Sequence, residues 1–233
     1  MITRVLVGML LLTACCLARA REGDAGTIYA PAAFLGPVAV KVTSLKELKF
    51  RRTVQQQYDF SCGSAALATL LTYHYEDRVP EAEIFMAMYN AGDKDKIRRE
   101  GFSLLDMKNY LQRRGYQSDG FKISLDKVRQ VGVPALVLIS NHGYKHFVVL
   151  KGVAARTVLL GDPALGARVM ARKEFEESWN GLVFLVRSHK EVAVRHFNQA
   201  AEWPSSGRLT NFVPLVSDRL LSPTLYMSII GGH

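Results

Sequence analysis

The stretch "VQQQYDFSCGSAALATLLTYHY", residues 54–75, places a cysteine immediately before a run of small and apolar residues that favour a helix. Apolar residues in this run recur with the three- and four-residue spacing of one helical face. They are Ala66, Leu67, Leu70 and Leu71. We therefore expect a helix over residues 63–74, with Cys62 at or just before its first turn and with Asp59 and Ser61 as candidate capping residues.

Three roles are open for Cys62: a buried core residue, one half of a disulfide, or a nucleophile. At the start of a helix, the unpaired backbone N–H groups and the positive end of the helix dipole favour a thiolate. The same N–H groups can bind a developing oxyanion. The position of Cys62 therefore meets two needs of a thiol protease.

The N-terminus has the pattern of an export signal. Arg4 precedes an apolar run over residues 5–12, and the small-x-small triplet at 18–20 is typical of a cleavage site. We expect residues 1–20 to be a signal peptide, residues 21–52 to be an N-terminal extension, and the mature protein to be periplasmic.

A lipid anchor is the alternative maturation. Leu12–Cys15 resembles the lipobox of bacterial lipoproteins, in which Cys15 would become the lipidated first residue and attach the protein to the cell envelope. Only this route predicts membrane association. Cleavage after Ala20 would instead remove Cys15 and Cys16, and Cys62 would then be a lone thiol that cannot form an internal disulfide.

The composition of the 233 residues is globular, with 48% hydrophobic and 22% charged residues, and we expect a single core. The formal charge of +9 comes without a long Lys/Arg block, which argues against nucleic-acid binding and favours acidic surfaces or partners. The histidines are scattered and no CxxC pair is present, so the sequence indicates no metal site and no cofactor.

The first half of the chain reads as helical and the second half as sheet. Further helices are predicted over residues 80–90 and 103–115, the latter from a Ser103-x-x-Asp106 capping pattern. Between them, residues 93–100 read as a solvated charged loop. Beyond them we predict a strand over 117–123, a short helix over 124–132 and a buried strand over 135–139.

A hairpin then places a histidine beside an aspartate. Residues 146–152 and 156–162 read as two strands around a turn centred on Ala154, so that His146 and Asp162 would be directly opposed on one face. Their Cβ atoms would lie about 5 Å apart, which lets the carboxylate orient the imidazole as a general base.

Each of these residues also has an ordinary interpretation. His146 could be a satisfied strand histidine, and Asp162 could be a turn residue before Pro163. Their joint symmetry, together with the cysteine at a helix start, favours Cys-His-Asp nucleophilic catalysis. His74 and His142 are weaker candidates for the base, because one lies at the far end of the cysteine's helix and the other in a loop.

Gln56, six positions before Cys62, makes a family resemblance specific. Residues 53–186 resemble the C39 peptidases, papain-like cysteine proteases best known as domains of bacteriocin-exporting ABC transporters that remove leader peptides after a double glycine. The matching motifs are Gln56, Cys62-Gly63, His146-Phe147-Val148-Val149 and Asp162-Pro163. The resemblance implies an α+β papain-like fold in which an N-terminal helical half carries the nucleophile and a C-terminal antiparallel sheet carries the histidine and aspartate.

The resemblance also implies a role for each residue: Cys62 as nucleophile, His146 as general base, Asp162 as its orienter, and Gln56 as side-chain donor to the oxyanion. One residue departs from the family pattern, because Ser61 replaces the usual acidic residue before the cysteine. An export leader in place of a transporter indicates a free-standing exported member. Its architecture is similar to that of the proteases encoded with bacterial functional-amyloid secretion systems.

The function implied is a periplasmic cysteine protease that cleaves an exported protein or leader at a double-glycine site. Its partners would be that polypeptide substrate and components of a secretion system. One alternative is a non-catalytic module of this fold that binds unfolded cargo. Another is a papain-like hydrolase directed at peptidoglycan. The presence of all four site residues favours the enzyme.

Residues 187–233 are expected to form a C-terminal tail that ends in Gly231-Gly232. Counted back from Gly232 as position one, apolar residues stand at positions four, seven and twelve, as they do in double-glycine leaders. They are Ile229, Tyr226 and Leu221. One hypothesis is that the tail occupies the groove as an autoinhibitory pseudosubstrate; the alternative is an apolar tail that packs on the core or on a partner.

Overall fold

The computed structural model describes residues 26–32, 36–141 and 144–203, and the chain divides into two compact units, residues 1–47 and 48–233. The first unit contains an antiparallel hairpin of β1 (Gly26–Ala32) and β2 (Gly36–Val42). Helix α1 (Leu45–Phe50) follows the hairpin. The signal peptide, the lipobox with Cys15, the loop residue His142 and the Gly231-Gly232 tail all lie outside the described residues, so these expectations stay predictions.

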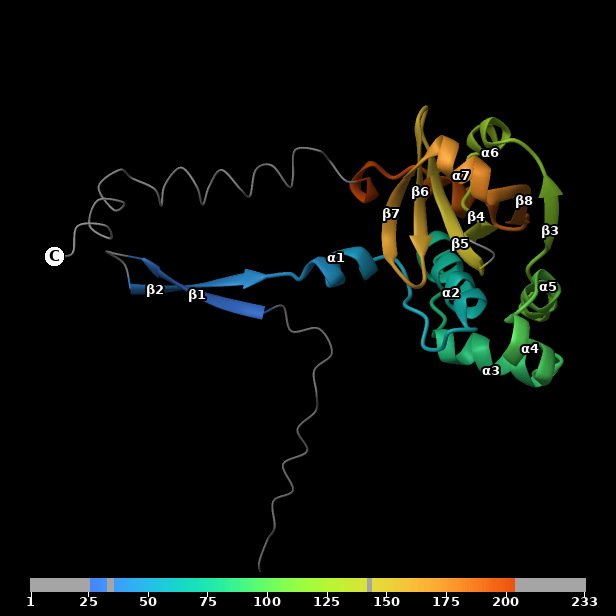
Figure 1. Ribbon diagram of the computed structural model, residues 1–233, viewed down its shortest axis with the longest axis horizontal. Helices are drawn as coiled ribbons and strands as arrows, with labels where there is room; N and C mark the ends of the chain where they lie inside the picture. Colours follow the sequence, from blue (N-terminus) through green and yellow to red (C-terminus); the bar gives the residue numbers. More distant parts are fainter. Residues whose placement is uncertain (1–25, 33–35, 142–143, 204–233) are drawn as a thin grey trace, which may run out of the picture. The chain divides into compact units, whose positions relative to one another are not determined.

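The second unit begins with helices and continues with a six-stranded antiparallel sheet in the order β3-β8-β4-β5-β6-β7 (Figure 1). The helices are α2 (Cys62–His74), α3 (Glu81–Ala91), α4 (Lys94–Glu100), α5 (Leu104–Arg113), α6 (Leu125–Val131), α7 (Arg172–Ser178), α8 (Lys190–Arg195) and the 3-10 turn η1 (Ala200–Glu202). The strands are β3 (Ser118–Lys122), β4 (Ala135–Asn141), β5 (Tyr144–Val153), β6 (Thr157–Asp162), β7 (Gly166–Ala171) and β8 (Trp179–Val186). This arrangement confirms the predicted α+β architecture. Among the described helices, none combines the length and the apolar character needed to cross a membrane.

Helices α2 and α5 begin close to where the sequence predicts. Helix α2 starts at Cys62, one residue before the predicted start. Helix α5 is preceded by a complete capping box, in which the Ser103 hydroxyl accepts from the backbone N–H of Asp106 and the Asp106 carboxylate accepts from that of Ser103. The two capping interactions fix the chain direction as it enters α5.

The expected charged loop over residues 93–100 is wrong, because the segment forms α4. Asp93 caps this helix by accepting from the backbone N–H groups of Asp95 and Lys96. Ile97 is the buried residue of the helix, and Gly101 ends it with a φ of 77°. A single apolar residue gives no periodicity to read, so cap and glycine were the available signals.

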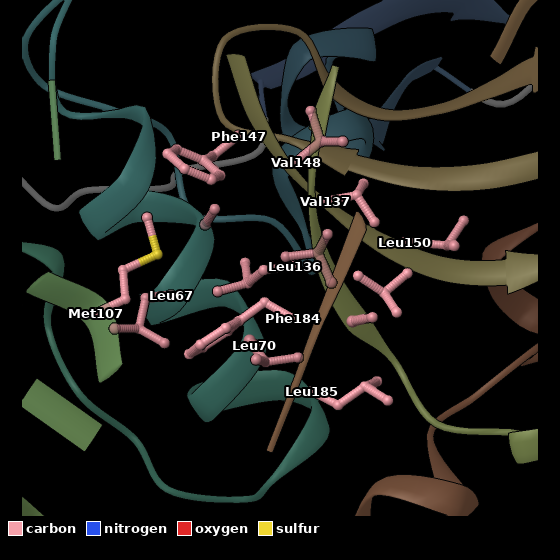
Figure 2. Close-up of a cluster of buried hydrophobic side chains, with 14 of the residues drawn as sticks. Leu67, Leu70, Met107, Leu136, Val137, Phe147, Val148, Leu150, Phe184 and Leu185 are labelled. Carbon is pink, nitrogen blue, oxygen red and sulfur yellow. The ribbon is translucent and has the colours of Figure 1, made fainter. Parts of the chain in front are cut away.

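The core lies between α2 and the sheet. Figure 2 shows apolar side chains from α2, α5, β4, β5 and β8 gathered in one cluster. Leu67 and Leu70 of α2 and Leu136 of β4 are fully buried there. Strand β5 is buried at every position from His146 to Val153, as expected for a central strand covered on both faces. The strand that carries His146 is therefore held rigidly against the helix that begins at Cys62.

Residues 187–203 fold onto the same unit. The side chain of Asn198 accepts from the backbone N–H of Val153 and donates to its carbonyl oxygen. Glu202 forms ion pairs with the buried Lys151 and, at 2.8 Å, with Arg52. Burial lowers the pKa of Lys151, while the carboxylate of Glu202 opposes that shift. The segment therefore supplies the counter-ion of a lysine inside the domain.

We predict that Glu202→Ala lowers the free energy of unfolding by about 3–5 kcal/mol, because it leaves Lys151 buried without its carboxylate. Urea denaturation followed by circular dichroism measures the change. Glu176→Ala is the matched control: it removes an exposed partner of Arg172 and should cost no more than about 1 kcal/mol. Equal losses in the free energy of unfolding of the two variants would show that the buried ion pair contributes no more to stability than the exposed one.

Candidate active site

Cys62 is the first residue of α2, and its thiol is free and buried, with the residue 7% exposed. Its backbone N–H has no hydrogen-bond acceptor in the part of the chain that the structure describes. The expectation that Asp59 or Ser61 caps this helix is wrong, since neither side chain bonds to its N–H groups. The start of α2 is therefore left uncapped beside the thiol.

Ser61, the residue that departs from the family pattern, is fully buried and points back along the chain. Its hydroxyl accepts from the Tyr58 N–H at 3.1 Å and donates to the Tyr58 carbonyl oxygen at 3.0 Å. The side chain thus closes the turn over residues 58–61 instead of capping α2. This turn fixes the backbone immediately before Cys62.

The structure brings His146 and Asp162 together, with His146 Nε2 2.7 Å from Asp162 Oδ1. The predicted register is wrong, however. Val149 pairs with Gly161, so Asp162 falls level with Val148, two residues from His146, and a bulge interrupts the pairing between Leu150 and Gly152. A shift of two residues keeps both side chains on one face, which is why the diagonal pair still meets.

Asp162 is held by more than the histidine. Its Oδ1 also accepts from the backbone N–H groups of Ala164 and Leu165, and its Oδ2 accepts from Arg168 Nε at 3.0 Å. Sequence reasoning missed Arg168. The Asp-Pro-x-x-Gly turn at 162–166 was the available signal, because it pairs β6 with β7 and returns Arg168 to the carboxylate.

His146 and Asp162 shift each other's pKa values. Burial lowers the pKa of His146, but the hydrogen bond with Asp162 and the nearby Cys62 thiol outweigh burial and raise it to about 9. Burial raises the pKa of Asp162, but the His146 hydrogen bond and charge, with the Ala164 N–H and Arg168, bring it below its usual value. Because Nε2 faces Asp162, Nδ1 is the ring nitrogen left for Cys62. The arrangement favours an imidazolium beside the thiol at neutral pH.

Gln56 lies beside this pair through its backbone, whose N–H donates to the Pro163 carbonyl oxygen at 3.0 Å. One side-chain N–H donates to the Tyr58 carbonyl oxygen at 3.0 Å, so the second N–H of the amide remains available. Gln55 and Gln57 are exposed while Gln56 is half-buried. This alternation sets Gln56 apart from its neighbours.

Tyr144 is a second residue that sequence reasoning missed, although its place two residues before His146 on one strand gives the same face. Its ring stacks on His146 with centroids 6.0 Å apart, and its hydroxyl donates to the Asp59 carbonyl oxygen at 3.2 Å. Tyr144 and Cys62 line a cleft of about 910 Å³, near the upper end of ordinary ligand sites.

His74 is not placed as a base for Cys62. It is buried, its Nδ1 lies 3.2 Å from the His196 carbonyl oxygen, and burial, with the charges of Lys151 and Arg52, holds its pKa well below the usual range. Within the described residues, no group of three or more His, Cys, Asp or Glu side chains is arranged to hold a metal ion. The thiol of Cys62 lines the cleft, and His146 and Asp162 form a buried hydrogen-bonded pair.

The sequence of this chain was compared with models of known protein families. The model of the peptidase C39 family matches residues 51–191, more than half of the chain. The chain belongs to the peptidase C39 family. The predicted resemblance to this family of cysteine-type peptidases is therefore confirmed.

Two relatives of this C39 family member carry the name probable functional amyloid protease FapD. The protein from Pseudomonas fluorescens is 44% identical over 63% of this chain and 65% of its own length. The protein from Pseudomonas aeruginosa is 42% identical over 65% of this chain and 67% of its own length. The chain thus matches about two thirds of each relative, and the expected similarity to functional-amyloid proteases is confirmed.

A solved structure supports the fold of this C39 family member. The crystal structure of the peptidase domain of Streptococcus ComA, a bifunctional ABC transporter, covers 58% of this chain and 96% of its own. The TM-score is 0.50 at 20% identity. This comparison confirms the predicted papain-like C39 fold.

We predict that Asp162→Asn lowers the pKa of His146 by about 1–3 pH units, because the carboxylate charge that favours the imidazolium is lost. The asparagine oxygen can still accept from Ala164 and Leu165, which preserves the turn. NMR titration of the histidine ring resonances measures the change. Asp126→Asn removes an exposed carboxylate paired with Arg172 and should leave His146 unchanged; an unchanged pKa in Asp162→Asn would contradict the assignment.

Proposed function

We propose that this protein is a cysteine peptidase that cleaves an exported polypeptide at a double-glycine site, with Cys62 as nucleophile, His146 as general acid–base and Asp162 as its orienter. The observation that carries the proposal is the buried His146–Asp162 hydrogen bond beside the free thiol at the start of α2. Family membership and the two FapD relatives support the same class of chemistry.

The chemistry begins with a thiolate–imidazolium pair. Cys62 Sγ attacks the substrate carbonyl carbon, and the carbonyl π electrons move to oxygen. His146 then gives its proton to the leaving amine as the C–N bond breaks, which leaves a thioester on Cys62. His146 takes a proton from water, the hydroxide oxygen bonds to the acyl carbon, and the thiolate departs. Asp162 stabilises the imidazolium at both proton transfers.

The oxyanion needs donors that are in place before the reaction. The N–H of Cys62, which has no acceptor within the described residues, provides one. Gln56 provides the other through the amide N–H that Tyr58 leaves available. An acidic residue in place of Ser61 could accept from the Tyr58 N–H but could not donate to its carbonyl oxygen, so serine closes the turn without a buried charge.

The burial of the nucleophile supports glycine as the residue at the cleavage site. Cys62 and His146 are each 7% exposed, and the Tyr144 ring stacks on the imidazole. A substrate backbone without Cβ atoms can approach such a thiol, whereas larger residues would meet the surrounding side chains. The substrate class is therefore a polypeptide with a small-residue site, in keeping with double-glycine leaders.

The periplasm, with attachment through Cys15 as the alternative, is the compartment we propose from the leader sequence. The FapD relatives are named for functional amyloid, which favours a role in processing a protein during amyloid or biofilm secretion. A purely cargo-binding module would not require a histidine whose pKa is raised to about 9 next to a free thiol. The enzyme accounts for these features and the binding module does not.

We predict that Cys62→Ala lowers the rate of cleavage of a Gly-Gly peptide by about 10³-fold or more, because the covalent route is lost. Product formation followed by mass spectrometry measures the rate, and a thioester adduct on Cys62 should be trapped by acid quenching of the wild-type reaction. Ser188→Ala, an exchange outside the cleft, is the control. Unchanged cleavage in Cys62→Ala would reject the catalytic proposal.

Gln56→Ala is predicted to lower kcat by about 10²–10³-fold while binding of the peptide to the ground state changes little, since the donor acts on the oxyanion. Steady-state kinetics separate kcat from KM. Gln57→Ala makes the same change at an exposed neighbour and should leave both constants unaltered. Equal effects at the two positions would remove the oxyanion role from Gln56.

A further inference from the structure

Basic side chains gather at the cleft that contains Cys62. Three of them, Lys96, Arg98 and Arg99, come from α4, and Lys145 comes from the start of β5. The carboxylates of Asp59 and Glu100 also line the cleft. Four cations therefore stand against two anions, which gives the cleft a positive field.

Most of these cations are not engaged by the protein. Arg98 pairs with Asp95 at 2.9 Å. Lys96, Arg99 and Lys145 form no ion pair with any residue that the structure describes, and all three are exposed. They are available to an anionic ligand in the cleft.

The fold fixes α4 close to the nucleophile. Ile97 is 2% exposed and anchors the helix to the core, which leaves its basic residues in solvent. At the end of α4, a Cβ on Gly101 would lie 3.3 Å from the carbonyl oxygen of Phe60, two residues before Cys62. The φ of 77° at Gly101 favours glycine there. The cations are thus carried by an element packed against the loop that leads into the thiol.

Much of the remaining cleft wall is apolar. Phe102, Leu104, Leu138 and Phe147 line it together with the basic residues. A ligand that fits both parts has apolar and anionic groups on one chain, which describes an acidic polypeptide segment. The two carboxylates of the cleft disfavour a continuous phosphate backbone.

We propose that Lys96, Arg99 and Lys145 bind glutamate or aspartate side chains that flank the glycine site of the substrate, so that the peptidase selects acidic polypeptides. The proposal rests on the proposed function and adds a substrate class to it. The cations act on binding, because they steer and hold the chain without touching the reacting bond.

The test compares two peptides with the same apolar residues and one Gly-Gly site, one with glutamates on both sides of the site and one with glutamines. For the wild type at low ionic strength, kcat/KM should be about tenfold higher for the glutamate peptide, mainly through KM. High salt should reduce the ratio, because the contacts are exposed.

The decisive variant is Lys96→Gln/Arg99→Gln/Lys145→Gln, in which the ratio should fall to about one. Lys122→Gln/Lys127→Gln/Arg129→Gln is matched in residue types and net charge but lies outside the cleft, and it should keep the wild-type ratio. An equal loss in both variants, or no preference in the wild type, would overturn the proposal.

A second experiment separates failure of the proposed peptidase activity from failure of the charge selection. If the wild type cleaves neither peptide, fluorescence anisotropy with Cys62→Ala still measures whether the glutamate peptide binds about tenfold more tightly than the glutamine peptide. Tighter binding that is lost in the cleft variant supports the charge selection even then. Binding of a single-stranded oligonucleotide through the same cations, without discrimination between the peptides, would overturn it.

Discussion

The site depends on the hydrogen bond between His146 Nε2 and Asp162 Oδ1, at 2.7 Å in a buried setting. Burial by itself would leave the imidazole neutral, and a neutral imidazole could not hold a thiolate beside it or protonate a leaving amine. The carboxylate reverses this balance and raises the pKa of His146 to about 9. Arg168 and the Ala164 and Leu165 N–H groups keep the carboxylate itself ionised and fixed in place.

Two parts of the fold position the residues of the site. The helical half contributes α2, whose uncapped start holds the thiol and a free N–H, while the sheet supplies β5 and β6 with the base and its orienter. Packing of Leu67 and Leu70 against the central strands sets how far the two halves stand apart (Figure 2). The hydrophobic core therefore determines the geometry of a reaction that takes place at its edge.

Much of this could be predicted from the sequence where the signals are local. The spacing of apolar residues predicted α2, and the capping pattern predicted α5. The meeting of His146 and Asp162 was predicted from a register that proved wrong by two residues, because the turn lies between Val153 and Val158 and is not centred on Ala154. The bulge between Leu150 and Gly152, which sequence patterns do not reveal, reduces the offset from three residues to two. Because the side chains of a strand alternate between its two faces with a period of two residues, a two-residue offset still leaves His146 and Asp162 on the same face. The contacts of Arg168 with Asp162 and of Tyr144 with His146 follow from a turn and from strand spacing that were present in the sequence but not used, while the role of Ser61 lies in a turn with Tyr58 that the capping interpretation missed.

The most direct test of the central claim is the dependence of kcat/KM on pH for a Gly-Gly peptide through the alkaline range. Because the raised pKa keeps His146 protonated below about 9, activity should persist above neutrality and fall with a midpoint near 9 as the imidazolium loses its proton. A fall with a midpoint near the ordinary histidine value of 6.5 would contradict the account, because Asp162 would then not control the charge of His146.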